Sequence, residues 1–385
     1  MCHLGKFYPP ASGGIESHLQ TLARAQAELG LSVQVLCVNH MDDEGRDVTW
    51  KNFAATPTRN ENDGSVRVTR LGRRASIARL DICPGLVGAL RGLNPDNVDI
   101  IHLHVPNPTM ILALYACRPR VPWVIGYHSD VVKQKALLLL QRPFENWVFR
   151  EARAVFAASP EYPKASAYLQ RFADKTKIIP YGIDLGPFQD PGEDSLRYAE
   201  GLRREHGEPL WLAVGRLVYY KGLHNAIRAL TLVRGKLLIV GSGPLKGSLE
   251  TLAGELGVAS RVVWLGNLKA AELQGAYRAA TALWFPSNAR SEAFGLVQVE
   301  AMASGCPVIN CSIPGSGVSW VSPHEESGLT VGVDDWQDLA AAANRLLNDR
   351  ELSDRLRHHG RDRARRQFSA PRMAEMTFEI YREVR

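Results

Sequence analysis

Short runs of β-branched and aliphatic residues alternate with segments of helical periodicity along almost the whole chain. Such alternation is typical of parallel sheets covered by helices on both faces, because parallel strands need crossover connections and are buried on both sides. The strands expected in the first half are Met1–Leu4, Ser32–Val38, Ile100–His104, Trp123–Tyr127, Ala154–Ala158 and Lys177–Pro180. Those expected in the second half are Leu210–Val214, Lys236–Val240, Arg261–Leu265, Ala282–Pro286 and Cys306–Ile309. The sequence therefore predicts two doubly wound α/β units.

The length of 385 residues also favours two domains, because it exceeds the size at which a single core stops growing. Residues 184–194 show neither periodicity and mix Pro and Gly with polar residues, which is typical of a linker. We expect an N-terminal domain in residues 1–187 and a C-terminal domain in residues 188–368. The final helix, in residues 369–385, is expected to cross back to the N-terminal domain.

The composition is that of a globular enzyme, with 45% hydrophobic and 22% charged residues. No apolar run approaches the roughly 20 residues of a spanning helix, and no secretory signal pattern opens the chain, so we expect a cytoplasmic protein. The six cysteines and the histidines never fall into zinc-binding spacing, so we expect neither a metal site nor another cofactor.

Positive charge is concentrated in residues 118–177, which hold 11 Lys or Arg against 5 Asp or Glu, within a net charge of +6. Cations from Lys133 to Arg153 mix with Trp147, Phe149 and several leucines, a combination that suits an anionic membrane surface. A core helix with ordinary surface charge is the alternative. A second cationic loop is expected from Arg70, Arg73, Arg74 and Arg79.

Glycines and cations occur where expected strands end, which is the edge where doubly wound sheets bind ligands. Gly13 and Gly14 follow the first strand and precede a helix, so a phosphate could approach their backbone. Arg216 and Lys221 follow the strand Leu210–Val214, and both side chains suit phosphate oxygens. A plain turn and a pair of surface cations are the respective alternatives.

Two further loops of the second half point to the same chemistry. Gly243 belongs to a glycine turn after the strand Lys236–Val240. Residues 291–296 form a loop before a helix, so the amides of Phe294, Gly295 and Leu296 are expected at a helix N-terminus suited to a diphosphate. Glu292 and Glu300 lie on either side of those amides and could accept hydrogen bonds from sugar hydroxyls. The alternative makes Glu292 a capping carboxylate and Glu300 a solvated helical residue.

Taken together, these segments resemble the retaining glycosyltransferases of family 4. The resemblance is carried by residues 13–16, 215–217 with 221–222, 240–244, and 292–296 through 300–308, which occur in family order and span nearly the whole chain. It implies a GT-B fold, in which two Rossmann-like domains face each other across a cleft. The donor is then expected mainly on the C-terminal domain and the acceptor on the N-terminal domain.

The resemblance also implies roles for individual residues. Arg216 and Lys221 match the family's cations that neutralise the donor diphosphate in place of a metal. Glu292 matches the glutamate near the sugar hydroxyls, and Glu300 the one that holds the ribose. Gly13 and Gly14 would approach the donor phosphates from the opposite domain. His128, which follows the strand Trp123–Tyr127, resembles the family's histidine near the donor sugar, and a polar loop residue is its alternative.

Finer similarities, in residues 128–135 and 316–321, are to bacterial enzymes that build surface polysaccharides, such as O-antigen, on polyprenyl carriers. They imply transfer of a hexose, with GDP-mannose favoured, to a polyprenyl-diphosphate-linked saccharide at the inner face of the cell membrane. A UDP-sugar donor with a small-molecule or lipid acceptor is one alternative. A nucleotide-sugar-binding protein without catalysis is another.

Other classes fit the sequence less well. A dinucleotide-binding enzyme would need a third glycine after Gly241-Ser242-Gly243 and a later acidic residue, and neither follows. A phosphorylase would need a pyridoxal lysine segment. Nucleic acid is not expected as a partner, because the chain has no helix-turn-helix, aromatic RNA-binding strand or zinc pattern.

Overall fold

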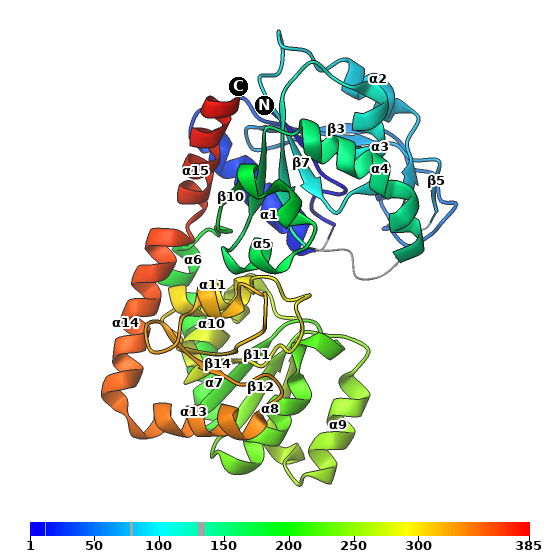
Figure 1. Ribbon diagram of the computed structural model, residues 1–385. Helices are drawn as coiled ribbons and strands as arrows, with labels where there is room; N and C mark the ends of the chain where they lie inside the picture. Colours follow the sequence, from blue (N-terminus) through cyan, green and yellow to red (C-terminus); the bar gives the residue numbers. More distant parts are fainter. Residues whose placement is uncertain (12, 78–79, 130–134) are drawn as a thin grey trace. The chain divides into compact units, whose positions relative to one another are not determined.

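The computed structural model describes residues 1–11, 13–77, 80–129 and 135–385, and for residues 135–139 it describes the backbone alone (Figure 1). The chain forms two compact units. Unit 1 comprises Met1–Gly182 and Ala370–Arg385, and unit 2 comprises Ile183–Ser369. The boundary expected from the sequence, at residue 187, lies slightly later than the one that the packing defines.

Unit 1 is built on an eight-stranded sheet in the order β10-β9-β8-β7-β1-β2-β4-β3. Its neighbouring strands run parallel, except for the antiparallel pair β3 and β4. The strands are β1 (Cys2–Leu4), β2 (Gln34–Val38), β3 (Arg59–Asp63), β4 (Val66–Leu71), β7 (Ile101–Val105), β8 (Trp123–Tyr127), β9 (Ala154–Ala157) and β10 (Thr176–Ile178). The helices are α1 (Gly14–Glu28), α2 (Gly85–Arg91), α3 (Pro108–Cys117), α4 (Lys135–Glu151) and α5 (Glu161–Ala165).

Unit 2 is built on a six-stranded, all-parallel sheet in the order β13-β12-β11-β14-β15-β16. The strands are β11 (Leu210–Val214), β12 (Lys236–Val240), β13 (Val262–Gly266), β14 (Ala282–Phe285), β15 (Val308–Cys311) and β16 (Gly328–Val331). The helices are α6 (Gly186–Gln189), α7 (Glu193–His206), α8 (Leu223–Ala229), α9 (Lys246–Glu255), α10 (Ala270–Ala279), α11 (Leu296–Ala303), α12 (Val318–Val321), α13 (Trp336–Asn348) and α14 (Arg350–Gln367).

The last helix, α15 (Ala370–Val384), belongs to unit 1 and lies beside α1 (Figure 1). Its buried residues Met373, Ala374 and Tyr381 pack in one cluster with Leu22 of α1 and Phe156 of β9. An amphipathic helix is held mainly by burying its apolar face. The final segment therefore completes the core of unit 1, although the whole of unit 2 separates it from that unit in sequence.

The expected linker 184–194 is more ordered than its composition predicts. It contains the short helix α6, and α7 begins at Glu193. The sequence analysis also missed three strands of the two main sheets: β3, whose residues are all polar, β4 and β16. β3 pairs with β4 along the edge of its sheet, where no buried face imposes an alternating pattern.

The prediction of a cationic loop at residues 70–79 is wrong for two of its four arginines. Arg70 and Arg73 are both buried. Arg70 pairs with Glu61, while Arg73 pairs with Asp81 at 3.0 Å and donates to backbone carbonyls, including that of Thr49. These guanidinium groups organise the neighbouring backbone. Arg74 is exposed, and Arg79 lies outside the described residues.

In the region that the structure describes, the segment 133–153 packs one face of α4 into unit 1 and leaves Leu140 exposed at 74%. Phe149 of α4 is fully buried, and Trp147 packs on Tyr115 and Trp123 at ring-centroid distances of 5.4 and 5.7 Å. Arg142 lies over the ring of Tyr168. The aromatic residues expected to enter a membrane therefore have partners within the protein. Lys133 lies outside the described residues.

Candidate active site

The donor-site residues predicted in the second half come together at one edge of the sheet of unit 2. β11 lies between β12 and β14, so the chain leaves β11 on one side and later returns on the other. Such a switch point opens a crevice at the carboxyl ends of the strands. The loops that carry Arg216, Gly243 and Glu292 follow these three adjacent strands.

Glycines allow the first two loops to touch. A Cβ atom on Gly241, whose φ is 123°, would lie 2.1 Å from the carbonyl oxygen of Gly215. A Cβ atom on Gly243 would lie 2.6 Å from the carbonyl oxygen of Leu217. Contacts that short do not occur between real side chains and backbone, so both positions need glycine for loop packing. The role of Gly243 in shaping the site is thus visible without a bound ligand.

Lys221 and Glu292 form the central ion pair of the site. Lys221 Nζ lies 2.5 Å from Glu292 Oε2, and only 13% and 12% of the two side chains are exposed. The ammonium also lies over the ring of Phe285, 5.0 Å from its centroid. Gly222 has a φ of 61°, and a Cβ atom there would meet the carbonyl oxygen of Pro286 at 1.9 Å. Because of this close contact, the turn that carries Lys221 is held against the end of β14.

Arg216 is exposed and lines a small pocket together with Lys221, Pro286 and Ser287. Ser287 is fully buried, and its hydroxyl lies 3.4 Å from Glu292 Oε2. The two cations therefore border the same small space, and Glu292 is bound to two of its lining residues, Lys221 and Ser287. This arrangement suits a ligand that carries both negative charge and hydroxyl groups.

The N-terminus of α11 has the form that the sequence predicts. Gly295 is its N-cap and adopts the left-handed region, with a φ of 78°. A Cβ atom on Gly295 would lie 2.7 Å from Cζ of Phe285. The side chain of Phe294 is buried and packs edge-to-face on Phe368. Phe294 thus anchors the loop through its side chain, and Leu296 opens the helix.

Glu300 is half-buried on α11 rather than a solvated helical residue. Its Oε2 accepts a hydrogen bond of 2.7 Å from the hydroxyl of Tyr277, which is buried. Burial raises the pKa of Glu300, against the opposing effects of this hydrogen bond and of the Lys221 charge. Tyr277 fixes one carboxylate oxygen, and the other can receive a ligand hydroxyl.

The remaining predicted residues belong to unit 1. Gly13 is the N-cap of α1 and Gly14 its first residue. A Cβ atom on Gly13 would lie 2.1 Å from Oε2 of Glu16, whereas one on Gly14 would meet nothing within 4 Å. The Glu16 oxygen is the far end of a flexible side chain that can move away, so this contact does not require glycine at position 13. The surroundings within unit 1 do not require glycine at position 14.

His128 is buried just after β8 and belongs to a group of histidines that the sequence analysis did not single out. Its Nε2 lies 3.0 Å from Nδ1 of His104, and its Nδ1 lies 2.7 Å from the hydroxyl of Tyr181. His102 and His104 point to the same face of β7. His3, on the neighbouring strand β1, is the register partner of His102. The two histidines at alternate positions of the strand 101–105 were the sequence signal that could have indicated this group.

The buried histidines share two features. Burial lowers the pKa of His3 to about 4 and that of His128 to about 3, and it places the pKa values of His18, His102 and His104 well below the usual range. Ring nitrogens of His3, His102 and His104 lie within 4.8 Å of one another, as do those of His18, His104 and His128. The rings are therefore neutral at neutral pH and closely grouped.

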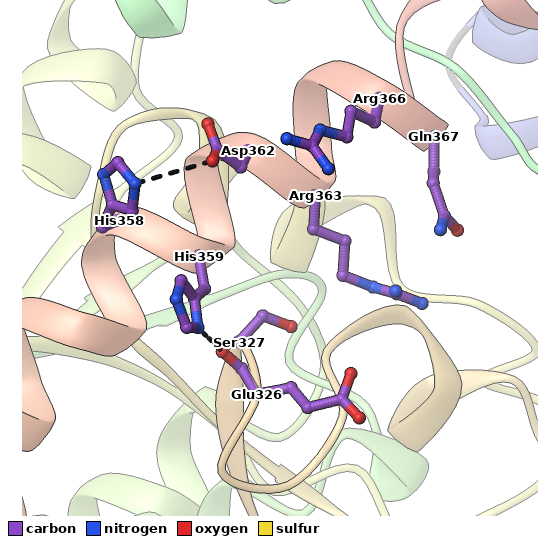
Figure 2. A pocket seen from close by; sticks show the side chains of 8 residues that line it. All are labelled: Glu326, Ser327, His358, His359, Asp362, Arg363, Arg366 and Gln367. Atoms are coloured by element: carbon purple, nitrogen blue, oxygen red, sulfur yellow. Dashed lines mark hydrogen bonds and ion pairs between the residues drawn. The ribbon is translucent and has the colours of Figure 1, made fainter.

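A separate pocket lies between α14 and the turn before β16 (Figure 2). Arg363 and Arg366 line it together with the carboxylates of Glu326 and Asp362, and Asp362 lies 3.6 Å from His358 (Figure 2). Arg363 also donates to the carbonyl oxygens of Trp320 and Val321. The predicted donor residues all lie elsewhere, so this pocket is not the candidate active site.

Two family models match the chain in succession. The model described as Glycosyltransferase Family 4 matches residues 12–186, and the model described as Glycosyl transferases group 1 matches residues 195–363. The chain is 31% identical to the O-antigen chain mannosyltransferase C of Escherichia coli over 97% of this chain and 95% of the relative. It is 37% identical to the D-rhamnosyltransferase WbpZ of Pseudomonas aeruginosa over 60% of each chain.

Solved structures show the same architecture. Sucrose-phosphate synthase from Thermosynechococcus elongatus matches with a TM-score of 0.75 and 25% identity over 99% of this chain and 98% of that chain. Anabaena HepE in complex with UDP matches with a TM-score of 0.76 and 21% identity over 99% of both chains. Two Rossmann-like domains of this kind define a glycosyltransferase of the GT-B fold, here a hexosyltransferase. The chain belongs to glycosyltransferase family 4.

The ion pair at the centre of the site gives the first prediction. We expect Lys221→Ala and Glu292→Ala each to abolish measurable transfer, with a loss in kcat of at least about 10²–10³-fold, because each removes a group aimed at the reacting sugar diphosphate. Turnover of purified variants is the measurement. Circular dichroism and the melting temperature should stay near those of the native protein, and Arg228→Ala, which removes an exposed cation of α8, serves as the control. Near-normal turnover in either site variant would contradict the assignment.

The buried histidines give a second prediction, concerning pH. Their folded pKa values lie below the unfolded value of about 6.5, so the unfolded chain takes up protons first as the pH falls. Stability should therefore be constant above pH 7 and fall below about 6.5. Each such histidine should contribute about 1.4 kcal/mol per pH unit once the pH is well below that value.

Chemical denaturation at pH 7.5, 6.5 and 5.5 measures this slope for the transition of unit 1. His102→Phe should make the slope shallower by about one proton. His358→Gln, which replaces an exposed histidine, should leave it unchanged. A stability that is level between pH 7.5 and 5.5 would show that the histidines are not held neutral.

Proposed function

We propose that this glycosyltransferase transfers mannose from GDP-mannose, with retention of anomeric configuration, to a lipid-linked saccharide of a growing surface polysaccharide. The supporting observation is the similarity to an O-antigen chain mannosyltransferase, which extends over 97% of this chain. The donor site of unit 2 supports it further, because cations, helix N–H groups and carboxylates gather at one sheet edge. The name of the same relative refers to the O-antigen chain, which supports a surface-polysaccharide acceptor, and we propose that this acceptor is lipid-linked.

The proposed donor site divides the work among its residues. Arg216 and Lys221 neutralise the diphosphate, so no metal is required for transfer. The amides of Phe294, Gly295 and Leu296 bind phosphate oxygens at the N-terminus of α11. On unit 1, the backbone at Gly13 and Gly14 also serves the donor phosphates.

The carboxylates and His128 serve the sugars. Glu292 accepts hydrogen bonds from hydroxyls of the transferred sugar while it stays paired with Lys221. Glu300 holds the ribose. His128 contacts the transferred sugar. These assignments use the free carboxylate oxygen of Glu300 and the neutral state of the His128 ring.

In the proposed reaction, the bond between C1 of the sugar and the leaving diphosphate oxygen breaks as the acceptor oxygen bonds to C1 on the same face. The acceptor proton passes to a donor phosphate oxygen, so no side chain acts as a committed base. Charge that develops on the diphosphate is stabilised by Lys221 and Arg216. The Lys221–Glu292 pair places this positive charge directly beside a carboxylate that orients the sugar.

The third prediction tests the donor. In a thermal-shift screen with EDTA, GDP should raise the melting temperature more than UDP, ADP or dTDP, because a ligand that binds only the folded state stabilises it. At a concentration of 100 times Kd, the stabilisation amounts to about 2.7 kcal/mol.

Each outcome of the screen has a definite meaning. A selective shift with UDP would overturn the GDP-mannose assignment and support the alternative of a UDP-sugar donor. No shift with any nucleotide would overturn the donor site. The similarity to a D-rhamnosyltransferase adds a second candidate sugar, so turnover should be compared between mannosyl and rhamnosyl donors of the same base.

We also propose that the enzyme works at the inner face of the cell membrane and touches anionic lipid. None of the described helices is both long and apolar enough to cross a membrane. Phe149 is buried and Trp147 packs on other rings of unit 1, so we propose a second surface for the contact. We define the apolar patch as the exposed side chains of Trp50, Phe53, Ile77 and Ile82, with exposed fractions of 78%, 81%, 51% and 45%.

The apolar patch is held together by backbone contacts. The amide of Ser76 donates to the carbonyl oxygen of Asn52, which joins the loop of Trp50 and Phe53 to the hairpin of β5 (Ala75–Ile77) and β6 (Leu80–Ile82). The exposed cations Lys51 and Arg74 flank these apolar side chains. Aromatic and cationic side chains together suit an anionic bilayer surface.

The fourth prediction tests this contact. The double variant Trp50→Ser with Phe53→Ser should reduce binding to anionic phosphatidylglycerol vesicles at least about tenfold, because two large apolar side chains no longer leave water. Co-sedimentation measures the bound fraction. Leu196→Ser with Leu232→Ser, which removes two exposed leucines of unit 2, is the matched control. Equal binding by both double variants, or no binding by the native protein, would overturn the proposal.

A further inference from the structure

A row of hydrogen-bonded side chains runs through unit 1 behind His128. We define the histidine chain as Tyr181, His128, His104, His3 and Gln26. The successive nitrogen and oxygen atoms lie 2.7, 3.0, 3.0 and 2.8 Å apart. His128, His104, His3 and Gln26 are all at least nine-tenths buried. Water therefore does not compete for these hydrogen bonds, and each ring depends on its neighbours for partners.

The parallel register of the sheet brings the rings together. His3 of β1 is paired with His102 of β7, and His104 is paired with Gly126 of β8. Gly126 leaves room for the rings, because a Cβ atom there would lie 2.8 Å from His102 Nε2 and 3.3 Å from His104 Nδ1. Three neighbouring strands thus create the histidine chain, and a side chain at position 126 would disturb it.

The inner end of the histidine chain has a fixed direction. The hydroxyl of Thr377 donates to the carbonyl oxygen of Ala374, so its oxygen accepts from Nε2 of Gln26 at 2.9 Å. The amide nitrogen of Gln26 therefore faces α15, and its Oε1 faces His3. Since Oε1 is an acceptor, Nε2 of His3 must carry the proton.

This direction passes from ring to ring, because a neutral imidazole has one donor and one acceptor. His3 donates through Nε2, so its Nδ1 accepts from Nε2 of His104. Nδ1 of His104 then accepts from Nε2 of His128. Nδ1 of His128 is left as an acceptor, which the hydroxyl of Tyr181 satisfies. One set of tautomers thus satisfies every hydrogen bond of the histidine chain.

We propose that Gln26, His3 and His104 are positioning residues that hold His128 as the Nε2–H tautomer, with Nδ1 as a hydrogen-bond acceptor. This inference rests on the proposed function, in which His128 contacts the transferred sugar. It deepens that role, because Nδ1 accepts from a hydroxyl, here that of Tyr181, and a bound sugar hydroxyl would have to take the place of Tyr181 at this atom. The buried row thereby selects a ligand hydroxyl as the partner of His128.

The close grouping of rings also resembles a metal site, but the histidine chain uses the same atoms differently. A cation held by His3 and His104 would need the lone pairs of both His3 Nδ1 and His104 Nε2. In the histidine chain His104 Nε2 carries a proton and donates it in a hydrogen bond to His3 Nδ1, 3.0 Å away. Zinc binding would therefore replace that proton and remove the directional link to Gln26.

His102 offers a matched control. It lies two residues from His104 on β7, is equally buried, and its ring stacks on that of His104 at 4.3 Å. Its Nδ1 bonds to the hydroxyl of Tyr381 at 2.6 Å, and that hydroxyl accepts from Gln26 Nε2 at 3.2 Å, so His102 meets the histidine chain only at the amide nitrogen of Gln26 and makes none of its ring-to-ring bonds. The same substitution at 102 and 104 separates loss of packing from loss of the directional bonds.

The fifth prediction is read by nitrogen NMR of histidine-labelled protein, in EDTA, together with donor kinetics. The native spectrum should show His128 protonated at Nε2 alone. Gln26→Met leaves His128 and its direct partners intact, yet it should mix the two tautomers of His128 and lower kcat at least about tenfold, since a wrong histidine tautomer is costly in catalysis. His104→Phe should do the same, whereas His102→Phe should leave both readouts near the native values.

The NMR signal tests whether the histidine chain fixes the tautomer of His128, and kcat tests whether His128 contacts the sugar. The two claims can therefore fail separately. If His128 does not contact the sugar, His128→Phe will retain native turnover while the native tautomer signal stays as expected. The inference itself is overturned by an Nδ1–H or mixed His128 ring in the native protein. It is also overturned by a Gln26→Met variant with unchanged tautomer and kcat. A spectrum that changes when zinc replaces EDTA at equimolar amounts would instead establish a metal site.

Discussion

The parallel alignment of the strands is the constraint on which the other features of this glycosyltransferase depend. Because neighbouring strands run in one direction, the loops that follow them meet at the same sheet edge. In unit 2 this places the loops after β11, β12 and β14 side by side. In unit 1 the same register aligns His3, His102 and His104 across β1 and β7. Chemistry that is dispersed in the sequence is thereby concentrated in space.

Close backbone contacts then refine what the sheet arranges. Gly222 rests against Pro286, and Gly241 rests against Gly215, at distances that no Cβ atom would tolerate. These contacts hold Lys221 within reach of Glu292. The glycines of the site therefore act first as packing residues for the loops. They can also serve a phosphate ligand, because a glycine has no side chain that would cover the backbone N–H groups of its loop.

The surroundings of several charged and aromatic residues could not be predicted from their positions in the sequence. Arg70 and Arg73 occur in a run of cations, yet both are buried and bind Glu61, Asp81 and carbonyl oxygens. Trp147 and Phe149 looked like membrane anchors, but Phe149 is buried and the half-buried Trp147 packs on Trp123 within unit 1. Periodicity reports that a residue can face a core or a surface, and it does not identify the partner. Only the packing of other segments supplies that partner.

The sequence by itself determined the two-unit α/β fold, most strand positions, the loops that hold Arg216, Lys221 and Glu292, and the helix that carries Glu300, because hydrophobic alternation and glycine turns are local signals. The tertiary structure decided the Lys221–Glu292 pair, the bond from Tyr277 to Glu300 and the residues against which α15 packs, whereas the return of this helix to unit 1 was expected from the sequence. It also decided the histidine chain, whose members come from β1, β7, α1 and two loops. The physical reason is that a hydrogen bond or ion pair depends on distances between segments far apart in the chain, and no local pattern of residues encodes those distances.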